Sequence, residues 1–123
     1  EWVRNQPQGS HIQGYKNHFW NGLTSTAFAR IVHGVVTSDL FKPGVQHLVP
    51  AGRVTKDELI RIALASLSRS DVQVEAVDAR EGVDRTLNTI NAEFNEKLFR
   101  AAGYLSLPDI PLMVNELAAE LAN

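Results

Sequence analysis

The sequence contains no cysteine, no long apolar run and only one methionine, Met113. Without cysteine the chain forms neither disulfides nor zinc-thiolate sites, and this composition suits a reducing compartment. No stretch approaches the roughly 18 apolar residues that a membrane-spanning helix needs. No basic start leads into an apolar run and a small-residue cleavage site, as in a secretion signal. These absences predict a cytoplasmic protein with no membrane partner.

An excess of charge of one sign is also missing. The chain has 12 Lys and Arg against 14 Asp and Glu, a net charge of -2, and the basic residues are scattered. Nucleic-acid binders usually gather uncompensated basic residues on one face, so we expect no nucleic-acid partner. The hydrophobic share of 44% and the charged share of 21% are typical of globular proteins. A length of 123 residues predicts one domain over residues 1–123.

Helical and strand patterns alternate along the chain. Short segments of alternating polarity predict strands over 11–15, 45–50 and 72–77. We interpret 15–22 as a loop or an edge strand and 78–89 as a polar loop. Apolar spacing and capping residues predict four helices, over about 24–38, 55–69, 92–102 and from 106–109 to about 121. The predicted fold class is mixed α/β, with few short strands and about four helices.

Three of the predicted helices carry apolar stripes that we expect to face the core, and in the helix over 55–69 the stripe consists of Leu59, Ile60, Ala63, Leu64 and Leu67. Few strands are available to cover these faces, so some of them are expected to rest on a part of the protein outside this sequence or on a second copy of the chain. The residues expected to be buried are Phe28, Ile31, Val32, Val35 and Val36 in the helix over 24–38, and Ile110, Met113, Val114, Leu117 and Leu121 in the last helix.

The first residues resemble the end of a helix rather than its beginning. Glu1–Gln6 has apolar residues but no Ser, Thr or Asp before them to cap a helix. The only methionine is Met113. We therefore expect this sequence to be part of a longer protein.

Common signatures of a self-contained active site are absent. The four histidines, at 11, 18, 33 and 47, lack the short spacings of metal sites. The eight glycines form no Gly-x-Gly, which a dinucleotide cradle needs so that the backbone can approach the pyrophosphate. No serine lies in a Gly-x-Ser-x-Gly turn. We therefore expect no catalytic residue, no metal and no bound cofactor in this chain.

One short segment stands out as a candidate binding site. Asp84–Thr89 places the guanidinium of Arg85 among small polar side chains just before a predicted helix. A guanidinium can form two parallel hydrogen bonds to a phosphate. The alternative is structural: Arg85 pairs with Asp84 or a nearby Glu, while Asn88 or Thr89 caps the helix.

The order of motifs resembles a known family. The chain is similar to the C-terminal part of extended short-chain dehydrogenases/reductases, and within them to the dTDP-4-dehydrorhamnose reductase group of nucleotide-sugar reductases and epimerases. The resemblance covers essentially the whole chain. It rests on Tyr15–Gly22, Leu23-Thr24 opening a helix, Val45–Val49, the capped helix from Thr55, Arg85–Thr89 and Leu107-Pro108-Asp109.

This resemblance implies a substrate-binding domain for a nucleotide-diphosphate sugar. The family's N-terminal Rossmann domain binds NADPH or NADH and carries a catalytic Tyr-x-x-x-Lys pair. This chain lacks that pair, because Phe19 follows four residues after Tyr15 and Pro108 four after Tyr104. The chain alone is therefore expected to be inactive, with the Rossmann domain as its missing partner. The resemblance assigns substrate contacts to Arg85, Asp84 and Asn88 near the diphosphate, and to His18, Asn21 and Thr24 beside the sugar and nucleotide.

Two alternatives remain open at this point. The chain can be a non-catalytic binding or regulatory module on the same scaffold. It can also self-associate into a homo-oligomer that covers its apolar helix faces.

Overall fold

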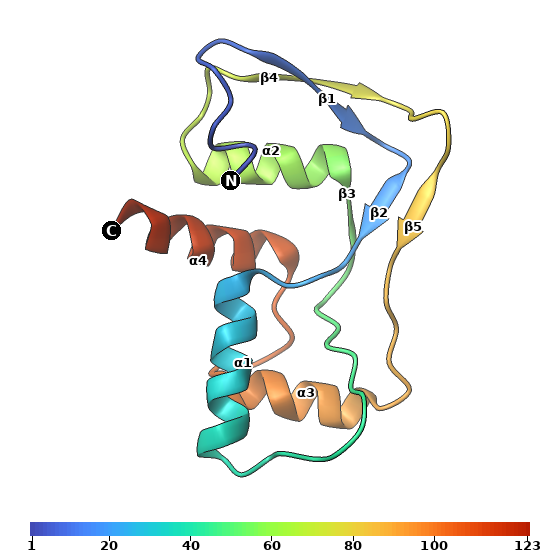
Figure 1. Ribbon diagram of the computed structural model, residues 1–123, viewed down its shortest axis with the longest axis vertical. Coiled ribbons are helices and arrows are strands. Elements are labelled where there is room, and N and C mark those ends of the chain that lie inside the picture. Colours follow the sequence, from blue (N-terminus) through green and yellow to red (C-terminus); the bar gives the residue numbers. More distant parts are fainter.

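The structure is a computed structural model that describes residues 1–123. It confirms the mixed α/β class with four helices, and it contains five short strands (Figure 1). The elements in chain order are β1 (His11–Tyr15), β2 (His18–Trp20), α1 (Ser25–Thr37), β3 (Val54–Thr55), α2 (Lys56–Ser66), β4 (Gln73–Val77), β5 (Val83–Arg85), α3 (Ala92–Ala101) and α4 (Ile110–Ala122).

The strands form two small sheets, and each sheet contains one strand from 11–20 and one from 73–85. β1 pairs with β4 in parallel, and β2 pairs in parallel with β5 and antiparallel with β3. Between the sheets, the N–H of Lys16 donates to the carbonyl of Val77 at 2.9 Å, and the N–H of Val83 donates to that of Asn17 at 3.0 Å. The segments β1–β2 and β4–β5 thus run side by side through a bend (Figure 1).

This topology corrects two expectations. Residues 18–20, expected in a loop or an edge strand, form the central strand of the order β3-β2-β5. Residues 83–85, expected in a polar loop, form the strand beside it. Both strands have only three residues, too few for an alternating pattern to be distinguished from a loop.

Two apolar clusters hold the helices in place. The smaller one lies between α2 and the β1–β4 pair and contains Ile60, Leu64 and Val72. The larger one joins α1, α3 and α4 to β3, and α4 also packs against α2, as Figure 1 shows. Its buried members are Ala27, Ile31, Val54, Leu98, Phe99, Tyr104, Ile110, Met113 and Val114.

The buried face of α1 agrees with the predicted one only in part: Ile31 is buried and Val35 packs against the core, as expected. Its buried residues are Thr26, Ala27, Ile31 and Gly34. A Cβ on Gly34 would lie 2.5 Å from the carbonyl oxygen of Ala101, so the small residues allow α1 to approach α3 closely. The larger apolar residues expected in the core are displaced to the surface, with side chains exposed by 53% at Phe28, 46% at Val32 and 75% at Val36.

The helix ends follow their capping residues. Thr24 caps α1, Asp109 caps α4, and Thr55 with Glu58 forms a complete capping box at α2. In α4, Ile110, Met113 and Val114 are buried as expected, whereas Leu121 in the last turn is 46% exposed. None of the helices is both long and apolar enough to cross a membrane.

The segment 45–50, predicted as a strand, is not one. Its backbone is bound by a side chain instead: Asn95 of α3 accepts from the N–H of Val49 at 2.9 Å and donates to the Val49 carbonyl at 2.8 Å. Asn95 is 2% exposed. A single amide group thus makes the two hydrogen bonds that a neighbouring strand would make.

Two further asparagines form the same arrangement. Asn17 binds the N–H and carbonyl of Ala79, both at 2.9 Å. Asn21 binds the N–H and carbonyl of Leu87 at 2.7 and 2.8 Å. We call these three pairs, Asn17 with Ala79, Asn21 with Leu87 and Asn95 with Val49, the asparagine bridges.

Residues 2–5 form a single turn in the structure. The N–H of Asn5 donates to the carbonyl of Glu1 at 3.0 Å. Arg69 fixes this turn by donating to the carbonyls of Arg4 and Gln6, each at 2.9 Å.

A polar chain connects α1 to α4 beside the main core. The Tyr104 hydroxyl donates to Glu116 at 2.6 Å, and Arg30 donates to the same carboxylate at 2.8 Å. Thr26 donates to Glu120 at 2.7 Å. Burial and then the neighbouring Glu116 carboxylate raise the pKa of Tyr104 to about 12.

The Asn95 bridge predicts that replacing Asn95 destabilises the protein more than replacing Asn91, which lies one turn earlier. Asn95→Ala leaves the N–H and carbonyl of Val49 without partners, so we expect the free energy of unfolding to fall by about 1–3 kcal/mol. Asn91→Ala is the matched control, because the side chain of Asn91 makes no capping hydrogen bond. Urea denaturation of both variants measures the difference, and equal stabilities would contradict the proposed role of the bridge.

The raised pKa of Tyr104 predicts a loss of stability in strong base. The unfolded chain ionises its tyrosine near the ordinary value of 10.0, whereas the folded protein keeps the proton to about 12. Stability from this group is therefore complete below pH 10 and falls as the pH rises through about 12. Denaturation of the parent protein and of Tyr104→Phe from pH 9 upward measures the effect, and the stability difference between the two should change only in the upper part of this range.

Candidate functional site

The structure brings two of the six predicted site residues into one hollow. This hollow has a volume of about 210 Å³ and lies where the β2–β5 sheet meets the first turn of α2. His18 and Arg85 line it, and the other four predicted residues do not. Its lining residues are His18, Phe19, Trp20, Lys56, Leu59, Val83 and Arg85, and we refer to it as the β2–β5 hollow.

Strand alternation explains which side chains share this face. His18 lies opposite Val83 in the register, and Trp20 lies opposite Arg85. Side chains two residues apart on a strand point to the same side of the sheet, so these four residues share a face. Lys56 and Leu59 complete the hollow from α2, whose start is fixed by the capping box at Thr55.

The hollow is lined by cationic groups and by no carboxylate. Arg85 makes no ion pair and no side-chain hydrogen bond within the chain, so its guanidinium is available to a ligand. Lys56 also has no ion pair, and its ammonium lies 5.2 Å from the centre of the Tyr15 ring. His18 supplies an imidazole that can carry a third positive charge. An anion with several oxygens, such as a phosphate or diphosphate, is the ligand that this set of donors would bind best.

Asp84 is held on the opposite face of the same sheet. Its carboxylate accepts from Arg53 at 3.3 Å and from the N–H of Thr86 at 2.9 Å. Thr86, through its hydroxyl and then its N–H, and Arg53 lower the pKa of Asp84. The Arg53 guanidinium also lies 4.2 Å from the centre of the Phe19 ring. Because Arg53 compensates Asp84, the expected structural alternative, an Arg85–Asp84 pair, does not form.

His18 is oriented by the backbone. Its Nε2 lies 3.1 Å from the carbonyl oxygen of Glu81, and a carbonyl can only accept, so Nε2 carries the hydrogen. The ring also packs on Tyr15, with centroids 4.9 Å apart. In the neutral ring Nδ1 is therefore an acceptor, and protonation turns it into a donor.

Two of the predicted residues have structural roles instead of lining the hollow. Thr24 is 8% exposed, and its hydroxyl caps α1 by accepting from the N–H of Ala27 at 3.3 Å. Asn21 is 3% exposed and uses its amide in the bridge to Leu87. This bridge fixes the chain two residues after Arg85, so Asn21 supports the hollow without contacting it.

Asn88 lies in a different hollow, of about 400 Å³, between 45–47 and 88–91. His47 Nδ1 lies 3.1 Å from the Asn88 carbonyl, and Gln46 donates to Thr89 at 3.1 Å. Asn91, not Asn88 or Thr89, stands at the N-cap of α3. This second hollow is lined by side-chain amides, a hydroxyl, the imidazole of His47 and two apolar residues, and by no Lys or Arg.

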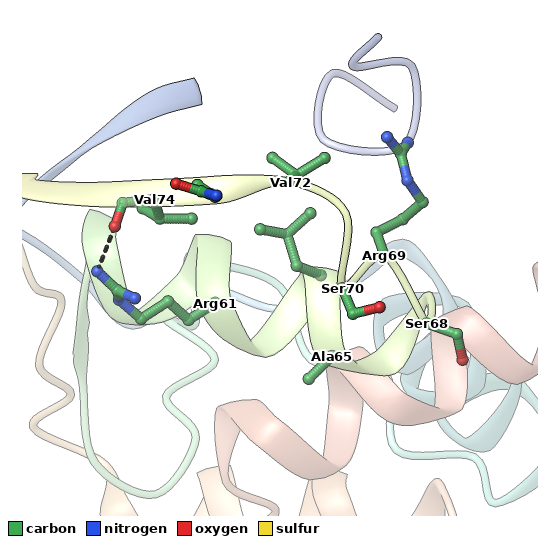
Figure 2. A pocket seen from close by; sticks show the side chains of 9 residues that line it. Arg61, Ala65, Ser68, Arg69, Ser70, Val72 and Val74 are labelled. Atoms are coloured by element: carbon green, nitrogen blue, oxygen red, sulfur yellow. Dashed lines mark hydrogen bonds between the residues drawn. The ribbon is translucent and has the colours of Figure 1, made fainter. Parts of the chain in front are cut away.

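The largest hollow of the molecule has its charges already compensated. It has a volume of about 700 Å³ and lies between α2 and β4, with Arg61 and Arg69 at its two ends (Figure 2). Arg61 donates to Asp57 at 3.0 Å and to the Val74 carbonyl at 2.9 Å. Arg69 donates to Asp71 at 2.7 Å, and this bond is the largest reason why the pKa of Asp71 is lowered. We therefore favour the smaller β2–β5 hollow for an anionic ligand.

Five of the seven residues that line the β2–β5 hollow were not predicted as site residues from the sequence, and they include Lys56 and Trp20. Lys56 follows directly after the capping residue Thr55 and so lies in the first turn of α2. The helix dipole favours anions at this end, so a lysine there could have indicated an anion-binding site from the sequence. Trp20 was part of an aromatic segment whose strand was not recognised.

The chain has neither the Gly-x-Gly of a dinucleotide cradle nor a cluster of metal-ligating side chains. No group of three or more His, Asp or Glu side chains could hold a metal ion. In comparisons with known proteins, no family model matches the chain and no curated sequence matches it.

The Asn21 bridge predicts that a buried amide controls the segment after β5. Asn21→Ala leaves the N–H and carbonyl of Leu87 without partners, and we expect a loss of about 1–3 kcal/mol in unfolding free energy. We also expect faster hydrogen exchange at the Leu87 amide, measured by NMR. Asn88→Ala, in the same segment but exposed, should change neither quantity, and unaltered exchange in Asn21→Ala would refute the role of the bridge.

Proposed function

We propose that this chain is the substrate-binding domain of an NAD(P)-dependent nucleotide-sugar reductase similar to the dTDP-4-dehydrorhamnose reductase group. In this proposal the β2–β5 hollow binds the diphosphate of the nucleotide sugar. The observation that carries the proposal is the unpaired guanidinium of Arg85 beside Lys56 and His18, in a hollow that no carboxylate lines.

The electrostatics of the sheet support an anionic ligand there. An arginine that was paired with a carboxylate of its own chain would bind an anion less well, because the ligand would compete with that carboxylate. Here Arg53 occupies Asp84 on the far face, at 3.3 Å. The charge of Arg85 is therefore not neutralised within the chain, and a diphosphate would face two permanent cations and an ionisable imidazole.

The proposal assigns binding, and not hydride transfer, to this chain. Because the sequence has no Gly-x-Gly and no Tyr-x-x-x-Lys, NADPH or NADH and the catalytic pair belong, in this proposal, to a Rossmann domain outside this sequence. A cytoplasmic location is part of the same proposal and is in keeping with the lack of cysteine.

The proposal predicts that Arg85 contributes to affinity through charge-assisted hydrogen bonds. We expect Arg85→Ala to raise the Kd for dTDP-glucose about tenfold or more, since a hydrogen bond to a charged group contributes about 1.5–3 kcal/mol. Lys56→Ala should weaken binding in the same direction. Isothermal titration calorimetry at low ionic strength measures both, and raising the salt should weaken binding to the parent protein.

Arg100→Ala provides the matched control for loss of one positive charge. Arg100 lies in α3, where it pairs with Glu96 at 3.6 Å, and it does not line the β2–β5 hollow. It should leave the Kd unchanged. Equal affinities of the Arg85→Ala variant and the parent protein would remove Arg85 from the site and overturn the proposal.

A further inference from the structure

Trp20 is a large flat side chain that lines the β2–β5 hollow beside Arg85. It lies opposite Arg85 in the parallel register, and neighbouring strands are about 4.8 Å apart. Its ring is therefore within reach of any group bound to the Arg85 guanidinium. Leu59 and Val83 add an apolar border to the same hollow.

The orientation of the Trp20 indole is fixed by the chain that follows it. A Cβ on Gly22 would lie 2.3 Å from Cζ2, 2.5 Å from Cε2 and 2.6 Å from Nε1 of the ring. Only glycine allows the indole to rest against this backbone. The ring also packs on the main core, so it forms a rigid wall rather than a mobile surface group.

The indole N–H of Trp20 has no hydrogen-bond partner within the chain. The side chain is only partly buried, so this donor remains accessible. A half-buried tryptophan usually packs its apolar ring against other groups, and its indole N–H usually donates to a hydrogen-bond acceptor. An apolar plane, a free donor and two cations in one place suit a ligand that joins a flat polar ring to a phosphate.

We propose that Trp20 is the surface on which the base of the nucleotide lies, while Arg85 and Lys56 bind the phosphates attached to it. This inference rests on the proposed function and adds the part of the ligand that the hollow recognises. At about 210 Å³ the hollow is smaller than the roughly 300–1,000 Å³ of pockets that enclose a whole small molecule. In this inference the hollow contacts only part of the nucleotide sugar, and the substrate sugar beyond the diphosphate lies outside it.

Intrinsic fluorescence tests the contact directly. The chain has two tryptophans, and Trp2 lies in the first turn with 55% of its surface exposed. In the Trp2→Phe protein, Trp20 is the only tryptophan. We expect thymidine diphosphate to quench its emission in a saturable way, and to bind about tenfold more tightly than inorganic pyrophosphate, which lacks the base.

Substitution of Trp20 separates the base from the phosphates. Trp20→Leu should raise the Kd for thymidine diphosphate about tenfold, measured by calorimetry, and change the Kd for pyrophosphate less than about twofold. Trp20→Phe keeps a ring and should retain part of the affinity. If circular dichroism shows that Trp20→Leu does not fold, Gly22→Ala is used instead, because it displaces the indole without removing it. It should lower the affinity for thymidine diphosphate and leave that for pyrophosphate nearly unchanged.

The outcomes distinguish this inference from the proposed function. If pyrophosphate binds and depends on Arg85, but thymidine diphosphate binds no better and ignores Trp20, the inference is wrong and the proposed function stands. If pyrophosphate and thymidine diphosphate both fail to bind, or if Arg85→Ala leaves both affinities unchanged, both are wrong. An equal loss for both ligands in Trp20→Phe would show a merely structural role for the ring and would also overturn the inference.

Discussion

The asparagine bridges are the interaction on which the arrangement of this protein depends. Its strands have two to five residues, so much of the backbone between them cannot find partners in a sheet. Asn17, Asn21 and Asn95 each give both hydrogen bonds of an amide to one residue of a distant segment. A buried backbone group without a partner costs about 1–3 kcal/mol. Three side chains therefore allow irregular segments to lie against the core without that cost.

The asparagine bridges also help to determine which face of the β2–β5 sheet carries the unpaired charge of Arg85. Asn17 fixes the start of the 78–82 loop and Asn21 fixes the end of β5, so the short strand between them keeps its register with β2. Strand alternation then separates two neighbouring residues of opposite charge. Asp84 faces Arg53 on one side of the sheet, while Arg85 faces the hollow on the other. A shift of the register by one residue would exchange these faces and remove the free guanidinium from the hollow.

The sequence predicted most of the elements and few of their contacts. Capping residues and apolar spacing located all four helices, and alternating polarity located β1 and β4. The prediction of a strand over 45–50 was wrong. In this segment the side chain of Asn95, and not a neighbouring strand, makes the two hydrogen bonds to the backbone of Val49. The buried face of α1 was predicted only in part: Ile31 is buried, but Gly34 packs closely against Ala101 and the larger Phe28 and Val36 are exposed. Arg85 and His18 were predicted as candidate site residues and line the β2–β5 hollow, whereas the fold was needed to place Lys56 and Trp20 beside them.

The sequence by itself determined the features whose interactions lie within a few residues. The capping box joins Thr55 to Glu58, and the chain alone contains that information. Tertiary structure decided the rest, because the decisive partners are far apart in sequence. The bridges join residues separated by 62, 66 and 46 positions, and the Arg53–Asp84 pair spans 31. The packing of helices and strands, and not the local sequence pattern, decides which polar groups meet over such distances. It therefore also decides that Arg53 is paired with Asp84 and that Arg85 is left unpaired.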